Sequence, residues 1–388
     1  MAGLTGPNER LAQRVRRRLA DGALTVSRAD VALAVRDDAP TQGGARVLAT
    51  AEAVRDDLIG AGPLEPLLRE PGVTDVLVNG ADEVWVDRGA GLELTEIRFA
   101  GERELRRLAV RLAGAAGRRL DDAVPCADVR MPTGVRLHAV LPPVSPGRTC
   151  LSFRVPARHA LTLDDWTSDG SIPLAVAQLL RQLVSARLSF VVTGGTGSGK
   201  TTLLATLLGE ADPADRIVVV EDSAELRPDH PHVVRLEARV ANAEGAGAID
   251  LRALVREALR MRPDRLVVGE VRGAECVDLL AALNVGHDGG AGTLHANSPI
   301  DVPARVEALC TAGGLSRAAA HSQLAAGLRA FVHLARDRAG RRRLDSVGVP
   351  RRTATGLVEV VPAVRVVRGE LVDDVGRREL DRLLGGAP

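Results

Sequence analysis

Apolar and polar residues follow two different periods along the chain, and they divide it into two regions. In the first region, the alternation of apolar and polar residues predicts strands in four short segments. These segments are residues 74–79, 83–87, 130–140 and 150–155. Residues 103–115 instead have helical periodicity. The first region is therefore predicted to be a small α/β domain.

Beyond residue 172, strands and helices are predicted to alternate. The predicted strands are residues 189–193, 216–220 and 265–269, and the predicted helices are residues 173–186, 201–208 and 250–261. Asp250 is suited to cap the last of these helices, and Pro263 prevents its continuation. Strand–helix alternation of this length predicts a mainly parallel sheet covered by helices.

The same patterns divide the chain into five parts. They are a helical N-terminal extension (residues 1–50), a small α/β domain (51–155), a linker (156–172), a larger α/β domain (173–345) and a C-terminal tail (346–388). The extension has an arginine-rich helical pattern at residues 8–20. We interpret its arginines as a solvated helix face, and the alternative is a patch for acidic lipid or a protein partner.

Composition narrows the classes of function. A chain of 388 residues with 45% hydrophobic and 26% charged residues is typical of a globular protein with two domains. A formal net charge of +1 gives no general support for nucleic-acid binding. The four cysteines lack metal-ligand spacing and are expected to be reduced thiols. Without a signal-peptide core or an apolar run of about 18 residues, the expected location is cytoplasmic, with peripheral membrane contact at most.

One segment carries a specific nucleotide-binding signal. Residues 194–201 fit the Walker A pattern GxxxxGK[ST], between a predicted buried strand and a predicted helix. Its glycines allow backbone N–H groups to face phosphate oxygens, and the helix start adds the positive end of its dipole. Lys200, the only lysine in the chain, is expected to reach the β- and γ-phosphates of ATP, and the Thr201 hydroxyl to bind Mg²⁺. The expected cradle is Gly194, Gly195, Thr196, Gly197, Ser198, Gly199, Lys200, Thr201 and Thr202.

Three carboxylates at the ends of apolar strands are candidates for the chemistry of this site. The strand ending in Glu270 is expected to lie beside the phosphate-loop strand, so that Glu270 orients the attacking water or binds Mg²⁺. Gly269 stands where many NTPases have an Asp linked to Mg²⁺. Glu221 and Asp222 end another apolar strand and are candidate Mg²⁺ ligands, or groups that position the nucleophile.

Two histidines follow in a glycine-rich stretch. His287 and His295 are eight residues apart, after the strand of Glu270. We interpret both as sensors of the γ-phosphate, because an imidazole can report the presence of a nearby anion. A zinc site is disfavoured because no third ligand has a suitable spacing.

Together these motifs resemble the type II/type IV secretion-system ATPases, nearest the branch of Tad/Flp pili and conjugation-type systems. The Walker A loop and residues 221–226, 259–273 and 286–297 are similar, in that order, to the family's Walker A, Asp-box, Walker B and His-box motifs. The resemblance extends over roughly residues 55–340 and includes segments of the first domain. Gly290, Ala291 and Gly292 depart from the family, which usually has hydroxyl residues between the two histidines.

The resemblance implies a larger domain of the RecA-like P-loop NTPase fold and a homohexameric ring at the cytoplasmic face of the membrane. Nucleotide would lie between the two domains of one subunit, and an inner-membrane platform protein would be the partner. Arginines would close on the γ-phosphate. The candidates are Arg136 and Arg154, followed by Arg235 and Arg239.

Two other functions remain open on the sequence. A nucleic-acid translocase or helicase has a similar core, but aromatic residues make up only 2% of the chain and offer no platform for stacking bases. A nucleotide-gated scaffold with little turnover is the second alternative, and the unusual loop between the histidines is its only support.

Overall fold

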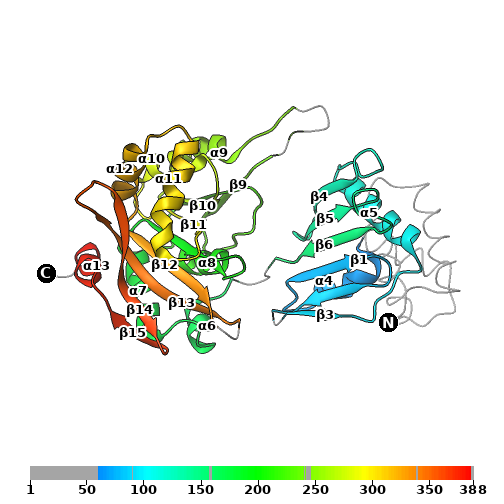
Figure 1. Cartoon of the computed structure of the whole chain (residues 1–388), viewed down its shortest axis with the longest axis horizontal. Coiled ribbons are helices and arrows are strands. Elements are labelled where there is room, and N and C mark those ends of the chain that lie inside the picture. The colour runs from blue at the N-terminus through cyan, green and yellow to red at the C-terminus, as the bar shows by residue number, and fades with distance from the viewer. Residues whose placement is uncertain are drawn as a thin grey trace. The chain divides into compact units, whose positions relative to one another are not determined.

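The computed structural model describes residues 60–89, 91–156, 160–239, 241, 246–337 and 340–385. The arginine-rich helical pattern predicted at residues 8–20 lies outside these ranges. The chain divides into two compact units between residues 158 and 159 (Figure 1). Both units combine helices with one sheet, which is the α/β class predicted from the sequence.

The first unit contains a six-stranded antiparallel sheet with the order β3-β2-β1-β6-β5-β4. Its strands are β1 (Asp75–Asn79), β2 (Val84–Asp87), β3 (Leu92–Leu94), β4 (Cys126–Arg130), β5 (Arg136–Val140) and β6 (Cys150–Arg154). Among its described residues, the helices are the 3-10 turn η1 (Gly62–Leu64), α4 (Glu65–Arg69) and α5 (Glu102–Ala115). Alternate strand residues, among them Val76, Leu137 and Phe153, form one core with the apolar face of α5.

The single strand predicted over residues 130–140 is wrong. The structure has a hairpin there, in which β4 and β5 pair from Cys126↔Val140 to Arg130↔Arg136. The turn between them is closed by Met131 N–H donating to Val135 O at 2.8 Å, and Gly134 has a φ of +87°. The glycine supplies a left-handed conformation that a continuous strand does not need.

The second unit contains a nine-stranded sheet with the order β15-β14-β13-β12-β7-β11-β10-β8-β9. The parallel strands are β7 (Phe190–Gly194), β8 (Ile217–Glu221), β9 (Val233–Glu237), β10 (Arg265–Val271), β11 (Ala291–His295) and β12 (Ala330–Arg336). Three antiparallel strands continue the sheet from β12: β13 (Arg342–Arg352), β14 (Val358–Val367) and β15 (Glu370–Asp373). The sheet is mainly parallel, as predicted.

The predicted position of β10 beside β7 is wrong. β11 lies between them, with His295 paired to Gly194 of β7 and Ala291 paired to Val267 of β10. A crossover through α10 (Glu275–Leu283) returns the chain to the sheet and inserts β11 there. The strand that ends in His295 is therefore the neighbour of the phosphate-loop strand.

Helices cover both faces of the parallel strands, which explains why these strands are continuous apolar runs. Alternate residues divide between two cores: Val192 and Val219 belong to one, and Val191 and Val218 to the other. The first core includes residues of α6 (Leu163–Ser168), α7 (Leu174–Ser185), α8 (Lys200–Gly209) and α13 (Arg377–Leu383). The second includes residues of α9 (Leu251–Leu259), α10, α11 (Val302–Ala312, preceded by the 3-10 turn η2, Pro299–Asp301) and α12 (Arg317–Gly327).

The expected linker and tail both contribute to the second unit. Within residues 156–172, α6 is capped by Thr162 and buries Leu163 and Trp166 in the core. The Trp166 Nε1–H donates to the Thr206 hydroxyl of α8 at 3.0 Å. Residues 346–388 include β14, β15, most of β13 and α13, whose Leu380 is fully buried. The fold of the second unit thus starts before the predicted helix at residue 173 and continues beyond residue 345.

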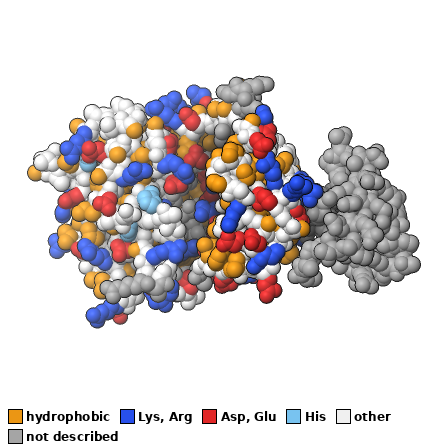
Figure 2. All heavy atoms as spheres, turned by 45° about the vertical axis from the view of Figure 1, so that its right-hand side comes forward, with side chains coloured by type: hydrophobic (Ala, Val, Ile, Leu, Met, Phe, Trp, Pro, Cys, Tyr) orange, Lys and Arg blue, Asp and Glu red, His pale blue; other side chains and the backbone are white. Residues whose placement is uncertain are grey.

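The surface has no concentration of one charge on the face that Figure 2 shows. Arginine and acidic side chains are interspersed there, with apolar side chains between them. Of the helices that the structure describes, none combines the length and apolar character needed to cross a bilayer.

A buried ion pair lies at the amino end of the parallel strands. Arg265, the first residue of β10, is 1% exposed and donates from Nε to Asp215 Oδ2 at 2.7 Å. A second N–H of Arg265 donates to Val184 O of α7 at 3.0 Å, and Asp215 also pairs with Arg187. The pair therefore connects α7, β10 and the segment before β8.

We expect Asp215→Ala to lower the free energy of unfolding by about 3 kcal/mol or more, because it leaves the Arg265 charge buried without its carboxylate. Urea denaturation monitored by circular dichroism measures this change. The control is Asp229→Ala at an exposed position, where we expect a change within about 0.5 kcal/mol. Equally small effects of the two substitutions would show that the buried pair contributes little.

Candidate active site

The phosphate loop makes a tight turn between β7 and α8. Gly197 and Gly199 have φ values of +69° and +96°, in the left-handed region that glycine enters without steric cost. Gly199 is also the N-cap of α8, so the unpaired N–H groups of the first helical turn face the loop. The Ser198 hydroxyl is buried and has no hydrogen-bond partner among the described residues. Backbone donors and a spare hydroxyl in this arrangement fit the oxygens of a bound phosphate.

Lys200 is the first residue of α8 and points into this loop. Its Nζ donates to Gly195 O at 2.8 Å. Partial burial lowers the pKa of Lys200 from its ordinary value, and the negative charge of Glu270 acts in the opposite direction. A phosphate group would replace a neutral carbonyl with an anionic partner for this ammonium. Thr201 and Thr202 follow in the first turn of α8, where both are partly exposed.

The structure brings Glu221, Glu270 and His295 to the same edge of the sheet as the phosphate loop. They lie at or near the carboxyl ends of β8, β10 and β11, which are neighbours in the sheet beside β7. Asp222 directly follows β8. The carboxyl edge of a parallel sheet is where α/β folds bind ligands.

An arginine that sequence analysis did not single out joins two of these acids. Arg272 donates from Nη2 to Glu270 Oε2 at 2.6 Å, and its Nε lies 3.4 Å from Asp222 Oδ2. All three side chains are partly exposed to solvent, so each ion pair contributes about 1 kcal/mol or less to stability. The main effect of Arg272 is therefore on the geometry of the site, because it holds the carboxylates of Asp222 and Glu270 beside one another.

Glu221 is buried, with an exposed fraction of 4%. Its Oε1 accepts the backbone N–H groups of Glu225 and Leu226 at 3.0 and 2.9 Å, while Oε2 has no partner in the described part of the chain. Burial raises the pKa of Glu221 to about 7, although both backbone hydrogen bonds and Arg235 favour the ionised form. One oxygen therefore anchors the segment after β8, and the other is available to a metal-bound water or to the nucleophile.

The packing of Glu221 explains why residue 269 is glycine. A Cβ at this position would lie 2.6 Å from Cγ of Glu221 and 3.0 Å from its Oε1. The side chain of Glu221 thus occupies the space that an Asp at position 269 would need. In this chain the carboxylate that fills this space belongs to Glu221 of β8, and position 269 of β10 contributes none.

The oxygen donors at this edge suit Mg²⁺. They are the Thr201 hydroxyl and the carboxylates of Glu221, Asp222 and Glu270. In the described part of the chain, no group of three or more His, Cys, Asp or Glu side chains is arranged to hold a metal ion. Mg²⁺ in phosphate-binding sites commonly uses one or two protein ligands, the phosphates and several waters, and the available donors fit that pattern.

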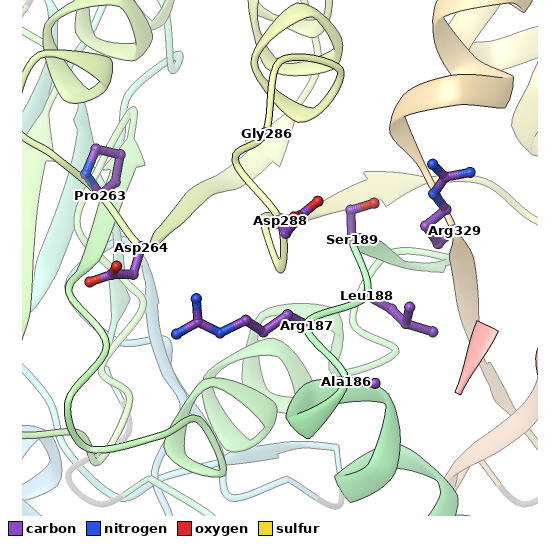
Figure 3. Close-up of a pocket in the computed structure, with 9 residues that line it drawn as sticks. All are labelled: Ala186, Arg187, Leu188, Ser189, Pro263, Asp264, Gly286, Asp288 and Arg329. Carbon is purple, nitrogen blue, oxygen red and sulfur yellow. The ribbon is translucent and has the colours of Figure 1, made fainter. Parts of the chain in front are cut away.

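The structure separates the two histidines. His295 ends β11 beside Gly194, whereas His287 lies in the turn before β11, at the opposite edge of the sheet. Figure 3 shows its neighbours Gly286 and Asp288 at a cavity of about 480 Å³ at this opposite edge. With a rise of about 3.3 Å per residue, β11 keeps His287 away from the phosphate loop. The hypothesis that His287 senses the γ-phosphate is wrong for this reason, and only His295 keeps that interpretation.

Close packing accounts for the glycines between the two histidines. A Cβ on Gly290 would lie 3.0 Å from Leu266 O and would overlap the side chain of Leu283, and a Cβ on Gly292 would lie 2.9 Å from Val268 O. Hydroxyl side chains therefore do not fit at these positions without movement of β10. Thr293 supplies a hydroxyl nearby and donates to Gly269 O at 2.7 Å.

Arg136 and Arg154 lie in the first unit, directly opposite one another on β5 and β6. Arg130 of β4 is paired with Arg136, so three arginines form a row across adjacent strands. Arg154 also lies 3.4 Å from Asp75 on β1. Like charges on directly opposite residues are unfavourable, and a bound anion would reduce their repulsion.

Arg235 and Arg239 belong to the second unit, at its edge strand β9. Arg235 is paired with Val219 of β8, and its charge acts on Glu221. Arg239 lies two residues beyond β9 and forms an isolated bridge with Ile249. Of these two arginines, Arg235 is the one whose charge affects the pKa of a site residue, Glu221.

The hairpin of β12 and β13 also reaches the phosphate loop, and sequence analysis did not identify it. Arg336 donates from Nη2 to Gly197 O at 2.7 Å. A Cβ on Gly199 would lie 3.1 Å from Cδ of Arg342 and 3.3 Å from Cη2 of Trp166. The only signal in the sequence is the cluster of arginines near Gly340, which local patterns alone do not connect with the loop.

A P-loop at a helix start, with carboxylates at neighbouring strand ends, defines the second unit as an NTPase domain of the RecA-like class. The family described as Type II/IV secretion system protein matches residues 57–365, and the chain belongs to this family.

Individual proteins agree with this assignment. A putative conjugal transfer protein of Mycobacterium tuberculosis strain H37Rv is 57% identical over 347 residues, covering 88% of this chain and 98% of that protein. The probable conjugal transfer protein TrbB of Sinorhizobium fredii strain NGR234 is 30% identical over 314 residues, covering 80% and 91%.

Two solved structures share the fold. The Legionella pneumophila ATPase DotB has a TM-score of 0.53 at 21% identity, covering 76% of this chain and 79% of its own. The pilus retraction motor PilT with bound ADP has a TM-score of 0.51 at 18% identity, covering 82% and 84%.

We expect Gly269→Ala to lower the free energy of unfolding by about 1–3 kcal/mol, because the added Cβ collides with Glu221. The double variant Gly269→Ala/Glu221→Ala should lose less than the sum of the two single changes, since the second substitution removes the colliding atoms. Gly114→Ala in α5 is the control, because a Cβ there meets no atom within 4 Å. Additive losses in the double variant would contradict the steric explanation.

Glu221 should make stability depend on pH. Because its pKa is raised from 4.5 to about 7, ionisation of Glu221 opposes folding, and stability is lost as the pH rises from 4.5 through 7. Glu221→Gln should therefore become more stable than the wild type over this window, by roughly 2–3 kcal/mol at pH 8. Urea denaturation at a series of pH values, without Mg²⁺ or nucleotide, measures the difference. Glu96→Gln at an exposed site is the control, and a pH-independent difference for Glu221→Gln would contradict the prediction.

Proposed function

We propose that this protein is a Mg²⁺-dependent ATPase that works as a homohexameric ring at the cytoplasmic face of the membrane and drives a type IV secretion or Tad/Flp pilus machine. The observation that carries the proposal is the meeting of the phosphate loop with Glu270, Glu221 and His295 at one edge of one sheet. Membership of the secretion family favours this function over a nucleic-acid motor.

The loop from Gly194 to Thr202 would hold the phosphates of ATP. Its inward N–H groups and the start of α8 would accept the negative charge, and Lys200 would leave the Gly195 carbonyl for the β- and γ-phosphates. The Thr201 hydroxyl would bind Mg²⁺ directly, with Glu221, Asp222 and Glu270 holding its waters. When bound, Mg²⁺ would supply positive charge that offsets the negative charge of the phosphates.

Glu270 is the group we propose to orient the attacking water. It is partly exposed at the carboxyl edge, and its negative charge acts on Lys200. Arg272 aligns Glu270 with Asp222, and Glu221 offers its free Oε2 to the same water network. His295, at the end of the strand beside the loop, would bind the γ-phosphate and release it after hydrolysis.

Cationic charge for the transferring phosphoryl group would come from Arg136 and Arg154. Their side-by-side arrangement on β5 and β6 supports this role, because it presents two guanidinium groups to one anion. The arginines would come from the same subunit or from a neighbour in the ring. Arg235 and Arg239 are the second candidates. Arg235 is the stronger of the two, because its charge acts on Glu221.

The work of the motor would follow from the change in charge after hydrolysis. ATP would attract arginines to the phosphate loop, and loss of the γ-phosphate would weaken that attraction. The two units would then move apart about the segment that joins them. In a ring, this movement would act on an inner-membrane platform protein, with peripheral membrane contact and without a specific nucleic-acid partner. The relatives described as conjugal transfer proteins support the placement in such a system.

Steady-state ATPase assays with Mg²⁺ test this function directly. We expect Lys200→Ala to abolish turnover and nucleotide binding, because it removes the ammonium that faces the phosphates. Glu270→Gln should reduce kcat by at least about 100-fold while ATP binding persists, since the amide cannot accept a proton from water. Glu359→Gln, at a partly exposed acid of β14, is the control for a charge loss remote from the site.

Size-exclusion chromatography with light scattering, run in parallel, tests the hexamer. Wild-type protein without turnover in the presence of membranes and platform protein, but with nucleotide-dependent assembly, would favour the scaffold instead. Turnover that requires single-stranded DNA would favour the nucleic-acid motor.

A further inference from the structure

The hairpin of β12 and β13 packs against the outer side of the phosphate loop. It contacts the loop at three of its glycines, through the Leu334 carbonyl at Gly194, the Arg336 guanidinium at Gly197 and the Arg342 side chain at Gly199. The contact follows from the sheet order, because β12 is the neighbour of β7 and Leu334 is paired with Gly194. The glycines of the loop therefore have a second function, which is to admit this hairpin.

Arg336 connects the loop to the turn of the hairpin. Its Nη2 donates to Gly197 O at 2.7 Å, and its Nη1 donates to Gly340 O at 3.1 Å. The planar guanidinium can make both bonds at once, which a lysine ammonium on a flexible stem does less well. In the same hairpin, the carboxylate of Asp337 pairs with Arg341 and Arg343.

The bond to Gly197 determines where the next N–H points. In a trans peptide the C=O and the following N–H point in opposite directions. Holding the Gly197 carbonyl outward on Arg336 therefore turns the Ser198 N–H inward. That N–H lies 3.4 Å from Gly195 O, the same carbonyl that accepts from Lys200 Nζ at 2.8 Å. Gly195 O thus accepts from both donors, and we expect a bound phosphate to take its place as their acceptor.

We propose that Arg336 is a positioning residue for nucleotide binding, which acts through the Gly197–Ser198 peptide and without contact with the phosphates. The inference rests on the proposed function, because it assigns a role toward ATP. It extends that function to a part of the chain, the β12–β13 hairpin, that is distant in sequence from the Walker A loop. Without Arg336, the peptide loses one of these two hydrogen bonds and depends more on the nucleotide for its order.

The experiment uses full-length protein with Trp85→Phe as the background. The chain has two tryptophans and no tyrosine, so the remaining Trp166 is the only indole, and its Cη2 lies 3.3 Å from a Cβ position on Gly199. Its fluorescence therefore reports on the loop. Calorimetric titration with a non-hydrolysable ATP analogue and Mg²⁺ gives Kd, and steady-state assays with ATP give KM and kcat.

We expect Arg336→Ala to raise Kd and KM by about five- to tenfold and to leave kcat within about twofold, because one charged hydrogen bond to the loop is lost. The Trp166 emission of the nucleotide-free variant should shift, and saturating analogue should restore the wild-type spectrum. Arg336→Lys should recover part of the affinity. Arg341→Ala is the matched control in the same hairpin, where its side chain binds Asp337, and we expect it to match the wild type.

The outcomes separate this inference from the proposed function. A wild-type protein that binds no nucleotide would overturn the proposed function, and the inference with it. Wild-type binding with an unchanged Kd, KM and spectrum in Arg336→Ala would overturn the inference alone. A loss of kcat at unchanged KM would also overturn it. If Arg336→Ala does not fold, Arg336→Lys decides, because affinity equal to the wild type would overturn the inference and an intermediate loss would support it.

Discussion

The orientation of a few peptide planes between β7 and α8 is the constraint on which the second unit depends. The N–H groups of the phosphate loop must face one point while the chain turns from a buried strand into a helix. This requires left-handed backbone at Gly197 and Gly199 and a rigid support on both flanks. The strand supplies one support and the helix start the other. The hairpin of β12 and β13 closes the outer side, where bare glycine backbone would otherwise face solvent.

The acidic groups of the site are organised by the same sheet. β8, β10 and β11 end at one edge because they are parallel, so residues about 75 positions apart in the chain become neighbours. Arg272 then holds the carboxylates of Glu270 and Asp222 in place, and the backbone N–H groups of Glu225 and Leu226 hold that of Glu221. The site is therefore a property of strand order and strand direction more than of any single segment.

Local patterns were sufficient for the features that local physics determines. The loop between β7 and α8, the Asp250 cap of α9 and the apolar strands follow from glycine, capping and periodicity, and the structure has each of them. The position of β11 did not follow, because crossover connections decide the order of parallel strands and the sequence between them does not show it. The same is true of Arg336, which meets Gly197 across 139 residues. His287 was expected beside His295, but strand β11 separates them. The short spacing of eight residues does not reveal that an extended strand places the two histidines at opposite edges of the sheet.

The contact between Gly269 and Glu221 has a consequence for comparison with other proteins. A side chain at position 269 would need the space that Glu221 fills, so the residue types at these two positions are not independent. A relative with Asp at the position of Gly269 needs a smaller residue at the position of Glu221, and the carboxylate then passes from one strand to its neighbour. An alignment that scores positions 221 and 269 separately would count the loss of a carboxylate at one of them. The physical unit is the pair, because positions 221 and 269 have room for only one of the two side chains.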